Sequence, residues 1–264
     1  MAVVVDLAAS VVVVDSAEVV VAQTGKQPGQ TMTLEALVAQ LRQAHGDALR
    51  AVVLYGSAAS GEDIAGKSDI NVLLIADTLP LATLRALGQT MRGWQEAGNP
   101  PVLEMTAQEW QSSADIFPME YADILERHKV LFGTLPLEGV VVQAADLRLQ
   151  VEQEAMGKLL RLRRGVMVAG TDTERQQELL RASLSTLLVI FRAVMRLHGE
   201  QPPRDAGQVV SWIGARCGFA VESYDRVAAL KRGTVLPAGE TEGVLEGYVA
   251  GMTALVAYLN QYAG

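Results

Sequence analysis

The sequence contains a single cysteine, no long apolar run and no excess of positive charge. Because Cys217 has no second cysteine to pair with, an internal disulfide and a zinc site built from cysteines are both excluded, and a reducing, cytoplasmic location is expected. No apolar run approaches the roughly 18 to 20 residues that a membrane span needs, so no membrane partner is expected. The formal net charge of -8 argues against a long binding surface for duplex nucleic acid, whereas a nucleotide carrying its own metal ions is compatible with an acidic protein.

Residues 1–31 form an N-terminal extension of unusual composition, with three valine tracts separated by acidic residues and alanines. They lack the basic start and the continuous apolar core of a signal peptide, since the first lysine is Lys26. Two interpretations stay open: a pair of extra strands, which valine favours, or an upstream extension of the reading frame with no role in the fold. Thr33 is a suitable N-cap for a helix, so we expect the functional unit to begin near Met32.

The rest of the chain predicts two domains of different kinds. Residues 32–145 alternate apolar strands with helical segments, and residues 146–264 keep helical periodicity almost to the end, with about five helices separated by glycines and prolines. The expected strands are 49–55, 70–76, 102–106 and 117–124, and a single helix is expected over 80–98. The predicted fold class is therefore α+β, a small mixed sheet followed by a C-terminal helical bundle.

One stretch, LYGSAASGEDIAGKSDINVLLI, places small and polar residues at the mouths of two strands. Gly56 and Ser57 end the first strand, where a glycine lets the backbone approach an anionic ligand and a serine adds donors to phosphates. Asp69 follows Ser57 by twelve positions, and Asp69 and Asn71 point to one face of the next strand because side chains alternate. Two oxygen-donating side chains on one face can hold divalent cations between protein and triphosphate.

This stretch resembles the nucleotidyltransferase signature of the DNA polymerase β superfamily, in which Gly-Ser, a spacer of about a dozen residues, and two acids one residue apart follow one another. The segment PVLEMTAQEW is similar to the strand of the aminoglycoside (streptomycin/spectinomycin) adenylyltransferases that carries a third carboxylate, here Glu104. The segment FPMEYADILERHKVLFG resembles the continuation found in bacterial nucleotidyltransferase-domain proteins, which also end in a helical bundle. The resemblance extends from about Met32 to the end of the chain.

The resemblance implies a role for each matching residue. Gly56 and Ser57 would hold the phosphates of a nucleoside triphosphate such as ATP, and Asp69 together with Asn71 would bind Mg²⁺ or Mn²⁺. Glu104 would take the proton from the hydroxyl of a small-molecule acceptor, or would add a metal ligand. The reaction would transfer a nucleoside monophosphate to that hydroxyl with loss of pyrophosphate. The same resemblance places Asp69, Asn71 and Glu104 on adjacent strands with converging side chains, close to Ser57.

The signature is broken at Asn71, where the family has its second acid. An amide oxygen still coordinates a hard cation but brings no charge, so the sequence predicts an attenuated enzyme. Glu62 or Asp63 in the loop would be able to supply the missing charge. The alternatives that stay open are a non-catalytic nucleotide-binding or regulatory protein, and an antitoxin-like partner of a helical toxin. A homodimer is compatible with each of them.

Other residues carry weaker signals. Glu120 and Asp123 are read either as supporting ligands or as solvated strand positions, and Glu104 itself can be read as a surface strand residue. The spacing of Arg192 and His198 superficially resembles the Arg-His motif of HEPN-type ribonucleases. The other interpretation is structural, because a histidine at a helix end is commonly a cap or a surface residue.

The remaining candidates have ordinary structural interpretations. A basic cluster on the first bundle helix would contact phosphates or form a solvated face. It consists of Lys158, Arg161, Arg163 and Arg164. The three tryptophans are expected to pack in the protein rather than to stack on bases, and they are Trp94, Trp110 and Trp212.

Overall fold

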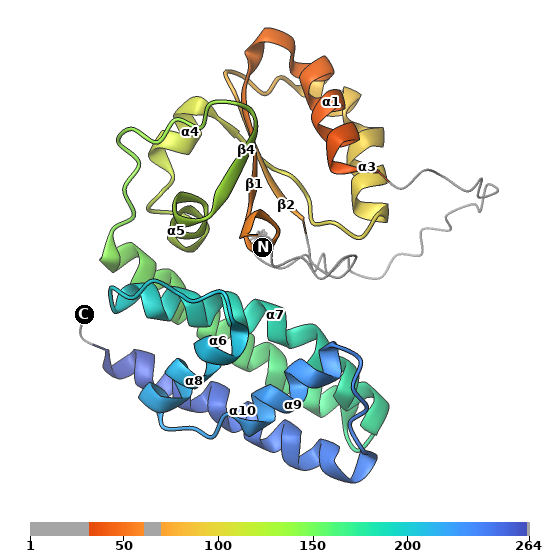
Figure 1. The fold of residues 1–264 in the computed structure, drawn as a ribbon, viewed down its shortest axis with the longest axis vertical. Helices are drawn as coiled ribbons and strands as arrows, with labels where there is room; N and C mark the ends of the chain where they lie inside the picture. The colour runs from red at the N-terminus through yellow and green to blue at the C-terminus, as the bar shows by residue number, and fades with distance from the viewer. Residues whose placement is uncertain (1–31, 61–69, 263–264) are drawn as a thin grey trace, which may run out of the picture. The chain divides into compact units, whose positions relative to one another are not determined.

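The computed structural model describes residues 32–60 and 70–262. They divide into two compact units (Figure 1). One unit contains the described residues up to Ala114 together with Asp123–Val141, and the other contains Asp115–Ala122 and the chain from Val142 onward. The predicted fold class is confirmed, since a small mixed sheet with its own helices is followed by a purely helical part.

The first unit is built on a four-stranded sheet. Its strands are β1 (Leu49–Tyr55), β2 (Asn71–Ala76), β3 (Leu103–Thr106) and β4 (His128–Gly133). Their order is β3-β2-β1-β4, with β1 antiparallel to β2 and β4, and β2 parallel to β3. The first three predicted strands are confirmed within one residue at each end.

Helices cover both faces of this sheet (Figure 1). They are α1 (Leu34–His45), α2 (Leu81–Ala86), α3 (Gly88–Glu96), α4 (Ala107–Ser112) and α5 (Pro118–Glu126), with short 3₁₀ turns η1 (Gly46–Ala48) and η2 (Ser57–Ser60). Thr33 caps α1 as predicted, because its Oγ1 accepts a hydrogen bond from the backbone of Ala36 at 3.2 Å. The single helix predicted over 80–98 is wrong in one respect: the chain forms two helices there, with Leu87 between them.

The two faces of the sheet bury different residues. On one face Val72 and Leu74 of β2 pack in a cluster with Leu37, Leu41 and Trp94 from α1 and α3. The opposite face of β2 carries Asn71, Leu73 and Ile75, because side chains alternate along a strand. Figure 1 places α4, and the end of α5 that belongs to this unit (Asp123–Glu126), on the side of the sheet away from α1 and α3.

The fourth predicted strand is wrong, since residues 117–124 lie mostly in α5. The segment buries Pro118, Tyr121 and Ile124, which are three residues apart and therefore share one side of a helix. A proline in the first turn is also typical of helix starts, because the missing N–H would have no partner there in any case. The true fourth strand, β4, begins two residues after α5 ends.

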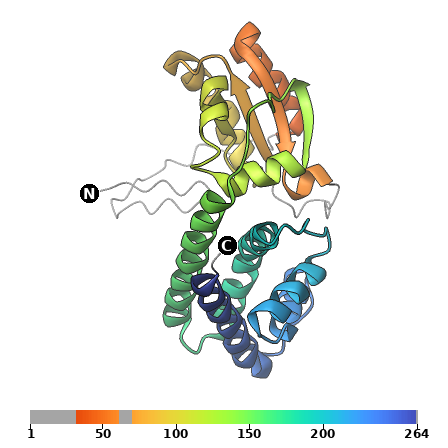
Figure 2. The same cartoon turned by 90° about the vertical axis from the view of Figure 1, so that its left-hand side faces the viewer.

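The helical unit contains the five predicted helices. They are α6 (Ala144–Ala169), α7 (Thr173–Leu197), α8 (Ala206–Cys217), α9 (Glu222–Lys231) and α10 (Ala238–Gln261). The long helices α6, α7 and α10 contact one another (Figure 2). Within this unit Gln150 of α6 accepts a hydrogen bond from the backbone of Met119 at 2.7 Å and donates one to Glu120 at 3.0 Å. Among the helices that are described, none is both long and apolar enough to cross a membrane.

Candidate functional site

The chain turns sharply at Gly56, directly after β1. Gly56 has a φ of 75°, and its carbonyl accepts a hydrogen bond from the backbone of Ala59 at 3.1 Å as the chain enters η2. A Cβ at position 56 would lie 3.0 Å from Nδ2 of Asn71 and 3.7 Å from Oδ2 of Asp123. Glycine is therefore favoured twice, by the backbone angle and by the close approach of two polar side chains.

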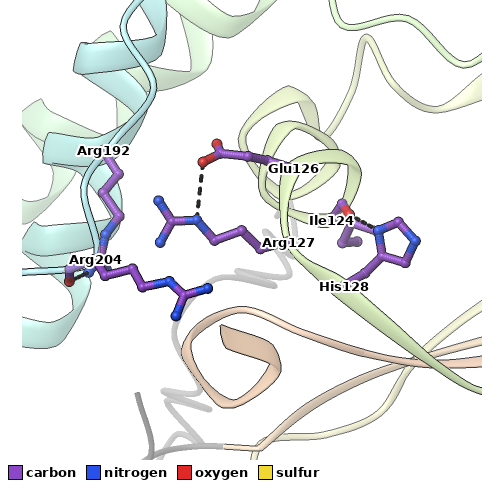
Figure 3. A network of polar contacts seen from close by, with 6 residues as sticks. All are labelled: Ile124, Glu126, Arg127, His128, Arg192 and Arg204. Atoms are coloured by element: carbon purple, nitrogen blue, oxygen red, sulfur yellow. Dashed lines mark hydrogen bonds and ion pairs between the residues drawn. The ribbon is translucent and has the colours of Figure 1, made fainter. Parts of the chain in front are cut away.

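Asn71 lies at the start of β2, in a row with two residues of neighbouring strands. Tyr55 of β1 is the register partner of both Asn71 and His128, so the three side chains share one face of the sheet. His128 Nδ1 donates a hydrogen bond to the carbonyl of Ile124 in α5 at 2.7 Å (Figure 3). In the neutral imidazole this bond leaves Nε2 as the acceptor. The last turn of α5 thus lies over the same face as Asn71.

Asp123 in α5 lies close to Gly56 and Asn71, whereas the sequence left open whether it is a supporting ligand or a solvated strand position. Its carboxylate and the Asn71 amide both lie within 4 Å of the position that a Cβ on Gly56 would take. The predicted strand over 117–124 does not bring Asp123 to this position, whereas α5 does. The spacing of three between the apolar residues Pro118, Tyr121 and Ile124 was the signal for the helix that brings Asp123 to the sheet.

Glu104 lies on the opposite face of the sheet from Asn71. Its register partner in the parallel strand is Leu74, and Val102, two residues earlier, packs in the same cluster as Val72 and Leu74. Partners in neighbouring strands point to the same side, so Glu104 faces α1 and α3. The predicted convergence of Asn71 and Glu104 is wrong, because a shift of one residue in register exchanges the two faces. Burial raises the pKa of the Glu104 carboxyl above its usual value.

Three of the predicted acids, Asp69, Glu62 and Asp63, lie outside the described residues. Ser57 begins η2. Among the residues that the structure describes, no group of three or more histidine, cysteine, aspartate or glutamate side chains is gathered to hold a metal ion. The Asn71 amide and the Asp123 carboxylate nevertheless provide hard oxygen donors, the kind that Mg²⁺ prefers.

Two of the tryptophans pack in the sheet unit. Trp94 is fully buried and donates its Nε1–H to the carbonyl of Pro100 at 2.9 Å, while Trp110 is equally buried and donates to the carbonyl of Pro136 at 2.7 Å. Neither ring is accessible to a base. In the helical unit the guanidinium of Arg216 lies 4.1 Å from the ring centre of Trp212.

Arg192 and His198 have separate partners. Nε2 of His198 lies 2.7 Å from the hydroxyl of Tyr258, at the C-terminal end of α7. Arg192 donates to the carbonyl of Arg204 at 3.3 Å (Figure 3). The capping position of His198 agrees with the structural interpretation of this residue.

The basic cluster on α6 is largely exposed. Arg161 forms an ion pair with Glu154 at 3.7 Å, and the side chains of Arg163 and Arg164 are exposed to solvent. A solvated helix face accounts for these residues.

No protein-family model and no curated protein matches the sequence. Among solved structures the chain is similar to spectinomycin adenyltransferase AAD(9) from Enterococcus faecialis, determined with ATP and spectinomycin, with a TM-score of 0.55 and 12% identity. The similarity covers 87% of this chain and 100% of that chain. At this identity it concerns the fold alone, and it confirms the predicted architecture of a mixed-sheet unit followed by helices.

Proposed function

We propose that this chain is a nucleotidyltransferase, which transfers a nucleoside monophosphate from a nucleoside triphosphate to a hydroxyl of a small molecule. The observation that supports this best is the glycine turn at Gly56, which lies against the first residue of β2 in a fold shared with an adenyltransferase. The signature read from the sequence falls on this same junction of β1 and β2.

The proposed binding roles follow from this junction. Gly56 and Ser57 hold the phosphates, where the absence of a side chain at position 56 lets the backbone come close. Asp69 and Asn71 bind Mg²⁺ or Mn²⁺ through oxygen atoms. When bound, the ion offsets the negative charge that develops on the triphosphate during transfer.

The acceptor is a small hydroxylated molecule, since the structural neighbour was determined with spectinomycin as well as ATP. The group that takes the proton of the acceptor hydroxyl has to lie on the face of the sheet that carries Asn71. Glu104 faces the other way, whereas His128 lies on the correct face. Asn71 leaves the site one charge short of the family signature, so the proposed activity is attenuated, by roughly a thousandfold if one charge is lost outright.

The test is a transfer assay with nucleoside triphosphates labelled at the α-phosphate, in Mg²⁺ or Mn²⁺, against a panel of aminocyclitols and aminoglycosides. We expect label in one acceptor together with stoichiometric release of pyrophosphate. Asp69→Asn should abolish transfer, while Asp47→Asn, at an exposed position of the same unit, should leave it unchanged. A protein that binds no nucleoside triphosphate in either metal would contradict the proposal.

A second function, nucleotide binding without transfer, is favoured by Asn71 itself. Isothermal titration with ATP, with and without Mg²⁺, separates the two. Metal-dependent binding in the absence of any pyrophosphate release across the acceptor panel would support the non-catalytic role.

A further inference from the structure

The position occupied by Asn71 is neutral, yet a carboxylate lies beside it. The last turn of α5 places Oδ2 of Asp123 and the first residue of β2 places Nδ2 of Asn71, both within 4 Å of the point where Gly56 has no Cβ. The two residues are far apart in the sequence and come together only because α5 folds over this face of the sheet. Gly56 is the element of the proposed site that binds phosphate, so any charge at this place acts directly on it.

Asp123 has interactions of its own, so its position alone distinguishes it from the other carboxylates of the described sheet unit. Asp77 follows the far end of β2 and is paired with Arg50, and the Glu126 carboxylate accepts a hydrogen bond from Arg127 at 3.1 Å (Figure 3). Glu109 completes a capping box at the start of α4. With Glu104 on the opposite face, Asp123 is a carboxylate of the described residues that lies near Gly56, at the start of β2.

We propose that Asp123 supplies the negative charge that Asn71 lacks, so that an acid from α5 and an amide from β2 together serve the metal-nucleotide site. This inference rests on the proposed function. Asn71 contributes an amide oxygen and Asp123 contributes the charge, which gives the pair the same total charge as one aspartate at position 71. An amide can present either its oxygen or its nitrogen by a half-turn of its terminal bond, so it can meet a cation in one state and a carboxylate in the other.

A charge exchange between the two positions tests this directly. Four proteins are compared by isothermal titration with ATP in the presence of Mg²⁺ and in the presence of a chelator: the unaltered chain, Asp123→Asn, Asn71→Asp, and the double exchange. Each substitution changes charge with little change of shape. Asp47→Asn serves as the matched control, because Asp47 is exposed in the same unit.

The expected order of Mg²⁺-dependent affinity follows from the number of carboxylates beside Gly56. Asp123→Asn, with none at these two positions, should bind Mg²⁺-ATP about tenfold more weakly, and Asn71→Asp, with two, about tenfold more tightly than the unaltered chain. The double exchange should return to within about threefold of the unaltered chain. In chelator the order should not hold, because without metal each added carboxylate repels the triphosphate and weakens its binding.

Several outcomes would overturn the inference while leaving the proposed function intact. One is unaltered Mg²⁺-dependent affinity in Asp123→Asn; another is a double exchange that binds like Asn71→Asp alone. Failure of the unaltered chain to bind any nucleoside triphosphate would instead remove the proposed function, and the inference with it. If Asp123→Asn unfolds, the melting temperature of Asn71→Asp, measured with and without Mg²⁺, still tests the role of Asp123. Without metal, the two neighbouring carboxylates should lower this melting temperature, and Mg²⁺ should restore it. No effect of Mg²⁺ on that melting temperature would refute the role of Asp123.

Discussion

Substitution of Gly56 by alanine tests whether the turn after β1 is built for a ligand or only for the fold. The substitution forces a side chain into a backbone with φ of 75°, which costs roughly 1–2 kcal/mol for a residue with a Cβ. The added methyl carbon would also lie 3.0 Å from Nδ2 of Asn71, so the amide has to shift by a few tenths of an ångström. We therefore expect two separate effects, one on stability and one on the position of Asn71.

Gly98→Ala separates these effects. Gly98 belongs to the same unit and has a φ of 87°, but a Cβ there would meet nothing within 4 Å. In urea unfolding both variants should lose roughly 1–2 kcal/mol, because both carry the same kind of backbone strain. Under the proposed function, Gly56→Ala should lose most of its affinity for Mg²⁺-ATP in titration, whereas Gly98→Ala should bind like the unaltered chain.

Equal nucleotide affinity in the two alanine variants would refute this reasoning. It would mean that the close approach at Gly56 belongs to the fold alone. Loss of affinity in both variants would show that a general loss of stability, rather than the displaced Asn71 amide, controls binding.

Three further predictions concern the fold and its pH dependence. Gly133→Ala should prevent the sheet unit from folding, as judged by circular dichroism, because the new Cβ would lie 1.9 Å from the backbone oxygen of Arg50 in β1. Asp205→Ala should lower the free energy of unfolding by about 1 kcal/mol, whereas Asp205→Asn should retain most of it, because the Asp205 side chain caps α8. Glu104→Gln should make the protein more stable at pH 7, with the gain over the unaltered chain vanishing as the pH falls below 4.5, the usual pKa of this group. The sign follows from burial, which raises the pKa of Glu104 in the folded state. At a pH above this raised pKa the carboxylate is ionised and destabilises the fold, whereas below pH 4.5 it is protonated in both states and has no such effect. Equal pH profiles of urea unfolding for the two proteins would contradict the last prediction.

Much of the fold could be predicted from local patterns. The strands β1 and β2 are short apolar runs with polar residues at their ends, and the five helices of the second unit have long apolar periodicity with clear stops. The secondary structure of residues 117–124 is more difficult to predict, because the few apolar residues of this segment fit a short strand as well as a helix. The spacing of three and the proline at 118 decide in favour of the helix.

The sequence predicts which residues of the candidate site lie at the ends of strands. It does not predict which of these residues meet across the sheet. The sequence placed Gly56 and Asn71 at the ends of adjacent strands, and the structure brings them together. The sequence did not contain the register of β3 against β2, which sets the face of Glu104 through a shift of a single residue. Nor did it indicate that α5 would carry Asp123 to the same face, since that contact depends on tertiary packing.

The presence of one amide and one carboxylate near Gly56 has a consequence for the protein without ligand. Two aspartates at positions 71 and 123 would repel each other whenever no cation lay between them. With asparagine at position 71 that repulsion is absent. Asparagine at this position therefore favours a stable ligand-free state, and under the proposed function it makes binding depend more strongly on the charge of Asp123. Under the proposed function, selection for stability without nucleotide and selection for rate act in opposite directions on position 71.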